Sequence, residues 1–290
     1  MNDIRILENE WIPMSDGTNL AAKIWLPEDA EQYPIPAVLE YIPYRKRDLK
    51  AVNDHKVHSY FARRGYAGVR VDIRGSGDSE GILRDEYLQQ ELNDGVEIIK
   101  WLAAQPWCDG NVGMMGISWG GFNGLQIAAL QPPELKAVIT VASTDDRYAD
   151  DVHYMGGCLL SDNLSWASVM FANNSCPPDP AIVGEKWRSM WLERLEGSGL
   201  WLKKWLEHQR RDNYWKHGSI CEDYGAVRCP VMAVSGWADG YSNTVFRILE
   251  NLEVPRKGIV GAYGHKYPHM GGPGPAMDFL NEAVRWWDQW

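Results

Sequence analysis

The sequence predicts an α/β fold with a mostly parallel sheet and helices on both faces. Short apolar runs alternate with longer amphipathic stretches along the 290 residues, as is typical of parallel strands joined by helices. The segment Gly-Ile-Ser-Trp-Gly at 116–120 lies between one apolar run and a helix-like run. Strands are predicted over residues 21–25, 37–41, 67–71, 112–115, 137–141, 231–234 and 258–261.

Helices are predicted over 54–64, 89–104, 122–131 and 277–289. The pattern is clearest in 89–104, where Leu92, Val96, Ile99 and Leu102 fall on one face.

Residues 145–225 show no clear strand and contain amphipathic helical pieces. We therefore predict a core of residues 1–144 and 226–290 with a helical cap inserted at 145–225. Two tryptophan pairs in this cap have a spacing of four, which places each pair on one helix face. They either pack the cap or line an apolar substrate site. The pairs are Trp187 with Trp191 and Trp201 with Trp205.

Composition excludes several classes of protein. The net charge of −10 argues against binding to nucleic acid or to anionic membranes. No apolar run is long enough to span a bilayer, and the first residues lack the pattern of a signal peptide. Five widely spaced cysteines without a C-x-x-C motif predict reduced thiols and a cytoplasmic location.

The segment 116–120 matches G-x-S-x-G, the nucleophile elbow of α/β-hydrolases, in which a strand turns sharply into a helix and exposes a serine. Ser118 is therefore the candidate nucleophile. The motif also occurs at 77–81, around Ser79. Ser79 lies between two acidic residues, which would oppose developing negative charge, and no helix of small residues follows it. We interpret Ser79 as a structural residue in a turn.

A serine nucleophile needs a base and an acid, which follow it in the order Ser, Asp or Glu, His. Asp239 and His265 each lie just beyond a predicted strand, where such sites are built. Alternatives remain: His269 for the base, and Asp145 or Asp146 for the acid. The oxyanion hole is expected to use the backbone N–H of Trp119, the residue after the nucleophile. The hydroxyl of Tyr44 is a possible second donor.

These segments resemble the CocE/NonD hydrolases of the X-Pro dipeptidyl-peptidase (S15) group. The resemblance extends over the whole chain and is carried by residues 43–46, 74–81, 116–120, 236–239 and 264–265. It implies an α/β-hydrolase fold with Ser118 as nucleophile, His265 as base and Asp239 as acid. It also implies an oxyanion hole formed by Tyr44 and Trp119.

The chain departs from the family in two places. Residues 261–263 read Gly-Ala-Tyr where the family commonly has Gly-Pro-Trp, a difference expected to alter the acyl pocket. The family's chain normally continues into a jelly-roll domain, which is not expected within these residues.

The sequence thus predicts a serine hydrolase acting on a small ester or amide, with no cofactor, metal, nucleic acid or membrane partner. The oligomeric state stays open. The acidic residues of 145–151 either bind a substrate ammonium, as dipeptidyl-peptidases and amino-acid ester hydrolases require, or form a solvated helix start. A non-catalytic binding protein would lack a triad residue, and a dehalogenase-like enzyme would carry aspartate in place of Ser118.

Overall fold

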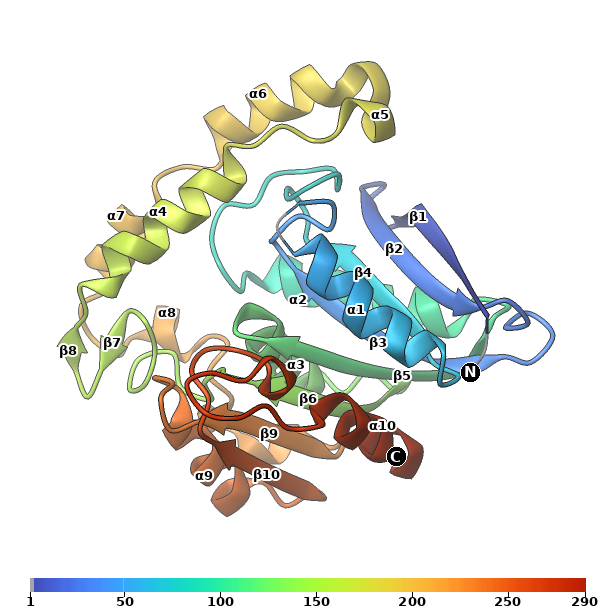
Figure 1. The fold of residues 1–290 in the computed structure, drawn as a ribbon. Coiled ribbons are helices and arrows are strands. Elements are labelled where there is room, and N and C mark those ends of the chain that lie inside the picture. Colours follow the sequence, from blue (N-terminus) through green and yellow to red (C-terminus); the bar gives the residue numbers. More distant parts are fainter. Residues whose placement is uncertain (1–2, 49) are drawn as a thin grey trace. The chain divides into compact units, whose positions relative to one another are not determined.

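The structure is a computed structural model that describes residues 3–48 and 50–290. It divides into two compact units, and each unit draws on two stretches of chain. Figure 1 labels the helices and strands. The first unit comprises residues 1–110 and 161–207, and the second comprises residues 111–160 and 208–290. The boundaries of these units differ from the predicted boundaries between core and cap, which follow residues 144 and 225. The division into core and cap therefore stays a prediction.

The first unit contains four strands with mixed parallel and antiparallel pairing. Strand β3 pairs in parallel with β4, β4 pairs antiparallel with β2, and β2 pairs antiparallel with β1. Helix α1 packs on β4 and β2, and α2 packs on β3. Strand β4 is buried along its whole length, as expected for a strand covered on both faces. The bounds are β1 Ile4–Pro13, β2 Asn19–Pro27, β3 Ile35–Ile42, α1 Ala51–Ala62, β4 Ala67–Asp72 and α2 Gln89–Ala103.

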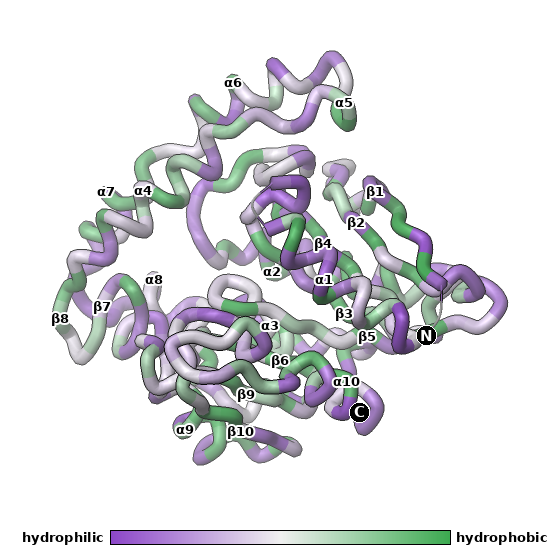
Figure 2. Tube along the Cα trace, viewed as in Figure 1, coloured by the Kyte–Doolittle hydropathy of each residue, from purple (hydrophilic) through white to green (hydrophobic). Residues whose placement is uncertain are grey.

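The same unit includes a helical segment, drawn from yellow-green to pale orange in Figure 1. Its elements are α4 Asp162–Asn174, α5 Pro180–Val183, η1 Gly184–Lys186, α6 Trp187–Gly197 and α7 Trp201–Glu207. Trp205 is fully buried and donates to Asp85 Oδ1 at 3.0 Å, so its pair with Trp201 packs the protein interior. Hydrophilic and hydrophobic residues mix along these helices (Figure 2), which expose apolar side chains such as Phe171 and Leu164.

The second unit contains a parallel sheet in the order β5, β6, β9, β10. The strand ends are level, because Ile117 pairs with Val141, Val141 with Val234, and Gly236 with Gly261. Helix α3 packs on β6, and α9 packs on β9 and β10. The bounds of the strands and longer helices are β5 Cys108–Ile117, α3 Trp119–Ala129, β6 Leu135–Val141, β9 Val231–Gly236, α9 Ser242–Asn251, β10 Arg256–Gly261 and α10 Phe279–Gln289. The shorter elements are β7 Tyr154–Met155, β8 Cys158–Leu159, α8 Asn213–Lys216, η2 Ile220–Glu222, η3 Tyr224–Ala226 and η4 Pro268–Met270.

The predicted α/β class is correct, and every predicted strand and helix overlaps an observed one. The sequence pattern missed β1, whose residues are mostly half-buried and show no clean alternation. It also missed α9 and the short hairpin of β7 and β8, which lies in a stretch expected to hold no strand. None of the helices within the described residues has the length and hydropathy needed to cross a bilayer.

A buried ionic cluster joins the strands and α1 of the first unit. Arg70 is fully buried on β4, and its Nε lies 3.1 Å from Asp54 Oδ2 and 4.0 Å from Glu40 Oε2. Its Nη1 donates to the carbonyl of Val71 at 2.8 Å. Burial raises the pKa of Asp54 to about 6, although the positive charge of Arg70 opposes the rise. One guanidinium therefore compensates the negative charge of two buried carboxylates.

Replacing Arg70 by methionine is expected to lower the free energy of unfolding by about 3–5 kcal/mol, because breaking a buried ion pair leaves an uncompensated charge. Urea denaturation at neutral pH measures this loss. The pKa of Asp54 is higher in the folded state than in the unfolded state, so the folded state binds the proton more tightly. The free energy of unfolding therefore falls as the pH rises from the unfolded pKa to the folded pKa of Asp54. The loss in the Arg70→Met protein should therefore shrink as the buffer is acidified from pH ~7.5 to ~5.

The matched control is Arg285→Met, because Arg285 is 72% exposed and pairs with Glu282 at 3.5 Å on the surface. Its loss should stay below about 1 kcal/mol. Equal losses in the two variants would show that the buried cluster does not stabilise the fold.

Candidate active site

Ser118 occupies a strained turn between β5 and α3. Its backbone has φ 57° and ψ −123°, a conformation that a residue with a side chain rarely adopts. The Ser118 N–H donates to the carbonyl of Val141 at 2.9 Å, and this bond ties the turn to β6. A Cβ on Gly116 would lie 2.5 Å from Gly120 Cα, so the turn closes only with glycine there. The predicted sharp turn from strand to helix is present at Ser118, and its role as nucleophile stays a prediction.

Asp239 and His265 are hydrogen-bonded to each other. His265 Nδ1 lies 2.9 Å from Asp239 Oδ2, and both residues follow strands of the second unit, β9 and β10. The carboxylate of Asp239 is fully buried, whereas 48% of the His265 side chain is exposed. An acid shielded from water that holds an accessible imidazole is the arrangement of a general base and its orienting partner. Ser118 lies at the same end of the parallel sheet, because the strand ends are level.

The alternatives for acid and base have other partners. Asp145 is bound by Arg247, whose Nε lies 2.9 Å from Oδ1, and by the Tyr224 hydroxyl. Asp146 Oδ2 lies 3.3 Å from Arg211. The ring of His269 stacks with Tyr267 and Phe279. These contacts favour Asp239 and His265 over the alternatives.

The second G-x-S-x-G motif folds into a different environment. Ser79 is fully buried in the first unit, where its hydroxyl donates to the carbonyl of Asp72 at 2.6 Å and accepts from the Ala21 N–H at 2.8 Å. Both bonds hold a loop against β2 and β4. A buried hydroxyl engaged in this way has no access to a substrate, which supports the structural interpretation of Ser79.

The two predicted oxyanion donors lie in different units. Trp119 begins α3 directly after Ser118 and is fully buried. Tyr44 follows β3 in the first unit and lies edge-on to Trp166, with ring centroids 6.4 Å apart. Burial and the carboxylates of Glu86 and Glu91 raise the pKa of Tyr44, so its hydroxyl keeps the proton that a donor needs. A joint role in an oxyanion hole stays a prediction.

The acidic residues of 145–151 form neither a helix nor a solvated surface. Asp145, Asp150 and Asp151 are all at most 3% exposed, in a loop after β6. Arg247 binds two of them, Asp145 and Asp150, the latter at 3.0 Å. The expectation of a solvated helix start is therefore wrong, because Arg247 neutralises Asp145 and Asp150 inside the protein, and Asp151 accepts a hydrogen bond from Tyr241.

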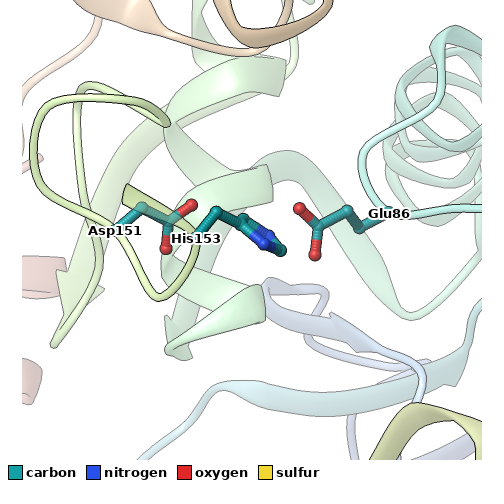
Figure 3. A group of neighbouring side chains, drawn as sticks. All are labelled: Glu86, Asp151 and His153. Carbon is teal, nitrogen blue, oxygen red and sulfur yellow. The ribbon is translucent and has the colours of Figure 1, made fainter. Parts of the chain in front are cut away.

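Asp151 and His153 lie two residues apart at the end of this loop (Figure 3). The His153 ring lies 5.0 Å from the ring of Trp215. Asp151 Oδ1 accepts from the hydroxyl of Tyr241 at 2.8 Å. Glu86, drawn in the same figure, belongs to the first unit.

Tyr241 is a residue of this site that sequence reasoning missed. It follows Asp239 by two positions and donates its N–H to Asp239 Oδ1 at 2.8 Å. Its ring centroid lies 5.8 Å from that of His265. Its closeness to Asp239 in the sequence was the one available signal, and no motif assigns it a role.

Comparison with known proteins identifies the family of this chain. Residues 16–267 match the sequence profile of the X-Pro dipeptidyl-peptidase (S15) family. The cocaine esterase of a Rhodococcus species is 28% identical over 288 residues, which cover 90% of this chain and 49% of that esterase. The chain thus spans about half the length of this relative.

Solved structures share the fold. A CocE/NonD family hydrolase from Staphylococcus aureus has a TM-score of 0.70 at 22% identity, over 89% of this chain and 46% of that one. An α-amino acid ester hydrolase has a TM-score of 0.65 at 23% identity, over 91% of this chain and 49% of that one. These likenesses and the family profile confirm the α/β-hydrolase fold and the resemblance predicted from the sequence. The chain belongs to the X-Pro dipeptidyl-peptidase (S15) family.

Proposed function

We propose that this chain carries the catalytic apparatus of a serine hydrolase that cleaves a carboxylic ester or amide through an acyl-serine intermediate. The observation that carries the proposal is the buried Asp239 bonded to the accessible His265, in the same unit and at the same sheet end as the strained Ser118. Membership of the family supports it.

The mechanism follows from these groups. The hydroxyl oxygen of Ser118 attacks the acyl carbon while His265 takes the hydroxyl proton, and Asp239 holds the imidazolium that forms. The N–H of Trp119 stabilises the negative charge on the former carbonyl oxygen, and the hydroxyl of Tyr44 stays the predicted second donor. His265 then returns the proton to the leaving alcohol or amine. Water repeats the sequence on the acyl-serine and releases the carboxylic acid.

A fluorophosphonate probe tests the proposal, because it phosphonylates only a serine that a base has activated. The wild-type protein should become labelled, and peptide mass mapping should place the label on Ser118. An unlabelled, folded wild-type protein would contradict the proposal.

A second candidate function is the recognition of a free amine, as in the amino-acid ester hydrolase to which the chain is similar. The structure gives it less support, because Arg247 and Arg211 bind Asp145, Asp146 and Asp150. We expect a neutral acyl ester to be the better substrate.

A substrate panel separates the two candidates. The p-nitrophenyl ester of a simple acid should be hydrolysed with a kcat/KM at least equal to that of an α-amino acid ester with the same leaving group. The N-acetylated form of that amino acid ester is the control, and it should react as well as the free amine. A strong preference for the free amine over its acetylated form would favour the second candidate.

We also propose a reducing compartment, the cytoplasm, as the location. None of the five cysteines, all of which lie within the described residues, forms a disulfide; Cys108 is buried and Cys158 is exposed. An oxidising compartment would favour disulfides in a chain with this many cysteines.

A further inference from the structure

We propose that Tyr241 is a positioning residue for the acid–base pair, and that Asp151 fixes Tyr241 through its hydroxyl. The inference rests on the serine hydrolase function proposed above. All the residues involved belong to the second unit.

The backbone of Tyr241 restrains the proposed acid. Its N–H donates to Asp239 Oδ1 at 2.8 Å, while Asp239 Oδ2 faces His265 Nδ1 at 2.9 Å. Each carboxylate oxygen thus has its own donor. A carboxylate held at one oxygen could rotate away from the imidazole, whereas one held at both keeps its plane.

The ring of Tyr241 contacts both the elbow helix and the proposed base. It meets Phe122 edge-on, with centroids 5.5 Å apart and an interplanar angle of 89°. Phe122 lies on α3, the helix that begins directly after Ser118. The other contact is with His265, at a centroid distance of 5.8 Å and a tilt of 47°. A shift of this ring would therefore move the imidazole relative to the helix that carries the nucleophile.

The hydroxyl of Tyr241 fixes the ring from the opposite end. It donates to Asp151 Oδ1 at 2.8 Å, and both residues are buried. The same carboxylate oxygen accepts from the N–H of Val152 at 2.7 Å, so the acceptor is itself held by its loop. Hydrogen bonds to charged groups are about twice as strong as neutral ones. The aspartate of this loop, shown in Figure 3, thus acts on the proposed acid and base through one tyrosine.

The test is Tyr241→Phe, which removes the hydroxyl and keeps both the ring and the N–H. The kcat for a p-nitrophenyl ester should fall roughly tenfold, within the hundredfold that a misplacement of about 1 Å can cost. KM should change by less than about twofold, because no interaction that binds substrate is removed. An unchanged kcat in folded Tyr241→Phe protein would overturn the inference.

Two variants of Asp151 separate a hydrogen bond from other effects of the side chain. Asp151→Ala removes the acceptor and should lower kcat as Tyr241→Phe does. Asp151→Asn keeps an acceptor oxygen and should recover most of that loss. If asparagine is as damaging as alanine, the charge of Asp151 and not its bond to Tyr241 is required, and the inference fails.

A spectroscopic readout checks that the effect reaches the acid–base pair. The low-field proton resonance of the bond between His265 and Asp239 should shift or broaden in Tyr241→Phe and in Asp151→Ala, but not in Asp151→Asn. A folded wild-type protein that the fluorophosphonate does not label would instead contradict the proposed function. Labelled wild type together with an unmoved resonance in Tyr241→Phe would contradict this inference alone.

Discussion

Ser118→Ala protein is expected to lose fluorophosphonate labelling and to hydrolyse p-nitrophenyl esters about 10⁴–10⁶-fold more slowly, since removal of one member of a triad costs nearly as much as removal of all. The strained turn around Ser118 presents the hydroxyl that the reaction consumes, and alanine fits the same turn without it. Single-turnover kinetics and intact-protein mass spectrometry measure both effects.

The matched control is Ser79→Ala, which alters the other G-x-S-x-G motif. Ser79 bonds to Asp72 and Ala21 inside the first unit. Its loss should lower the free energy of unfolding by about 1–3 kcal/mol, because the N–H of Ala21 is left without its acceptor. Turnover and labelling should remain. If Ser79→Ala abolished labelling while Ser118→Ala kept it, the nucleophile would be the other serine.

His265→Ala is expected to lower kcat/KM by about 10⁴-fold or more, because the Ser118 hydroxyl then keeps its proton at neutral pH. The hydrogen bond to buried Asp239 identifies this imidazole as the oriented one. Circular dichroism should show an unchanged fold, because nearly half of the His265 side chain is exposed.

His269→Ala is the comparison variant. His269 stacks with Tyr267 and Phe279, so its replacement should lower the unfolding temperature and leave turnover close to that of the wild type. The opposite pattern, with His269→Ala inactive and His265→Ala active, would assign the base to His269.

The parts of the site that sequence reasoning reached are those encoded locally. The local sequence determines the tight turn at Ser118, because a strand leads into the serine and a glycine lies on each side of it. Asp239 and His265 were found in the same way, because each follows an apolar run that forms a strand. The run before Asp239 forms the buried strand β9, and the run before His265 forms β10.

The parts that it missed depend on partners distant in the sequence. The acidic residues near 145 are neutralised by Arg247 and Arg211, and no local pattern indicates that these side chains meet. The role of Tyr241 likewise depends on Asp151, which lies 90 positions earlier. Strand β1 escaped detection for a different reason, because its half-buried positions blur the two-residue period.

The interleaving of the two units has a consequence for synthesis of the protein. The first unit needs residues 161–207, and the second needs residues 208–290, so neither is complete early in translation. A nascent chain of 200 residues already contains Ser118, but it lacks both Asp239 and His265. Because contacts between residues distant in sequence form slowly, hydrolytic activity would arise at the final stage of folding. An incomplete translation product that ends before residue 265 would be inert toward esters in the cell.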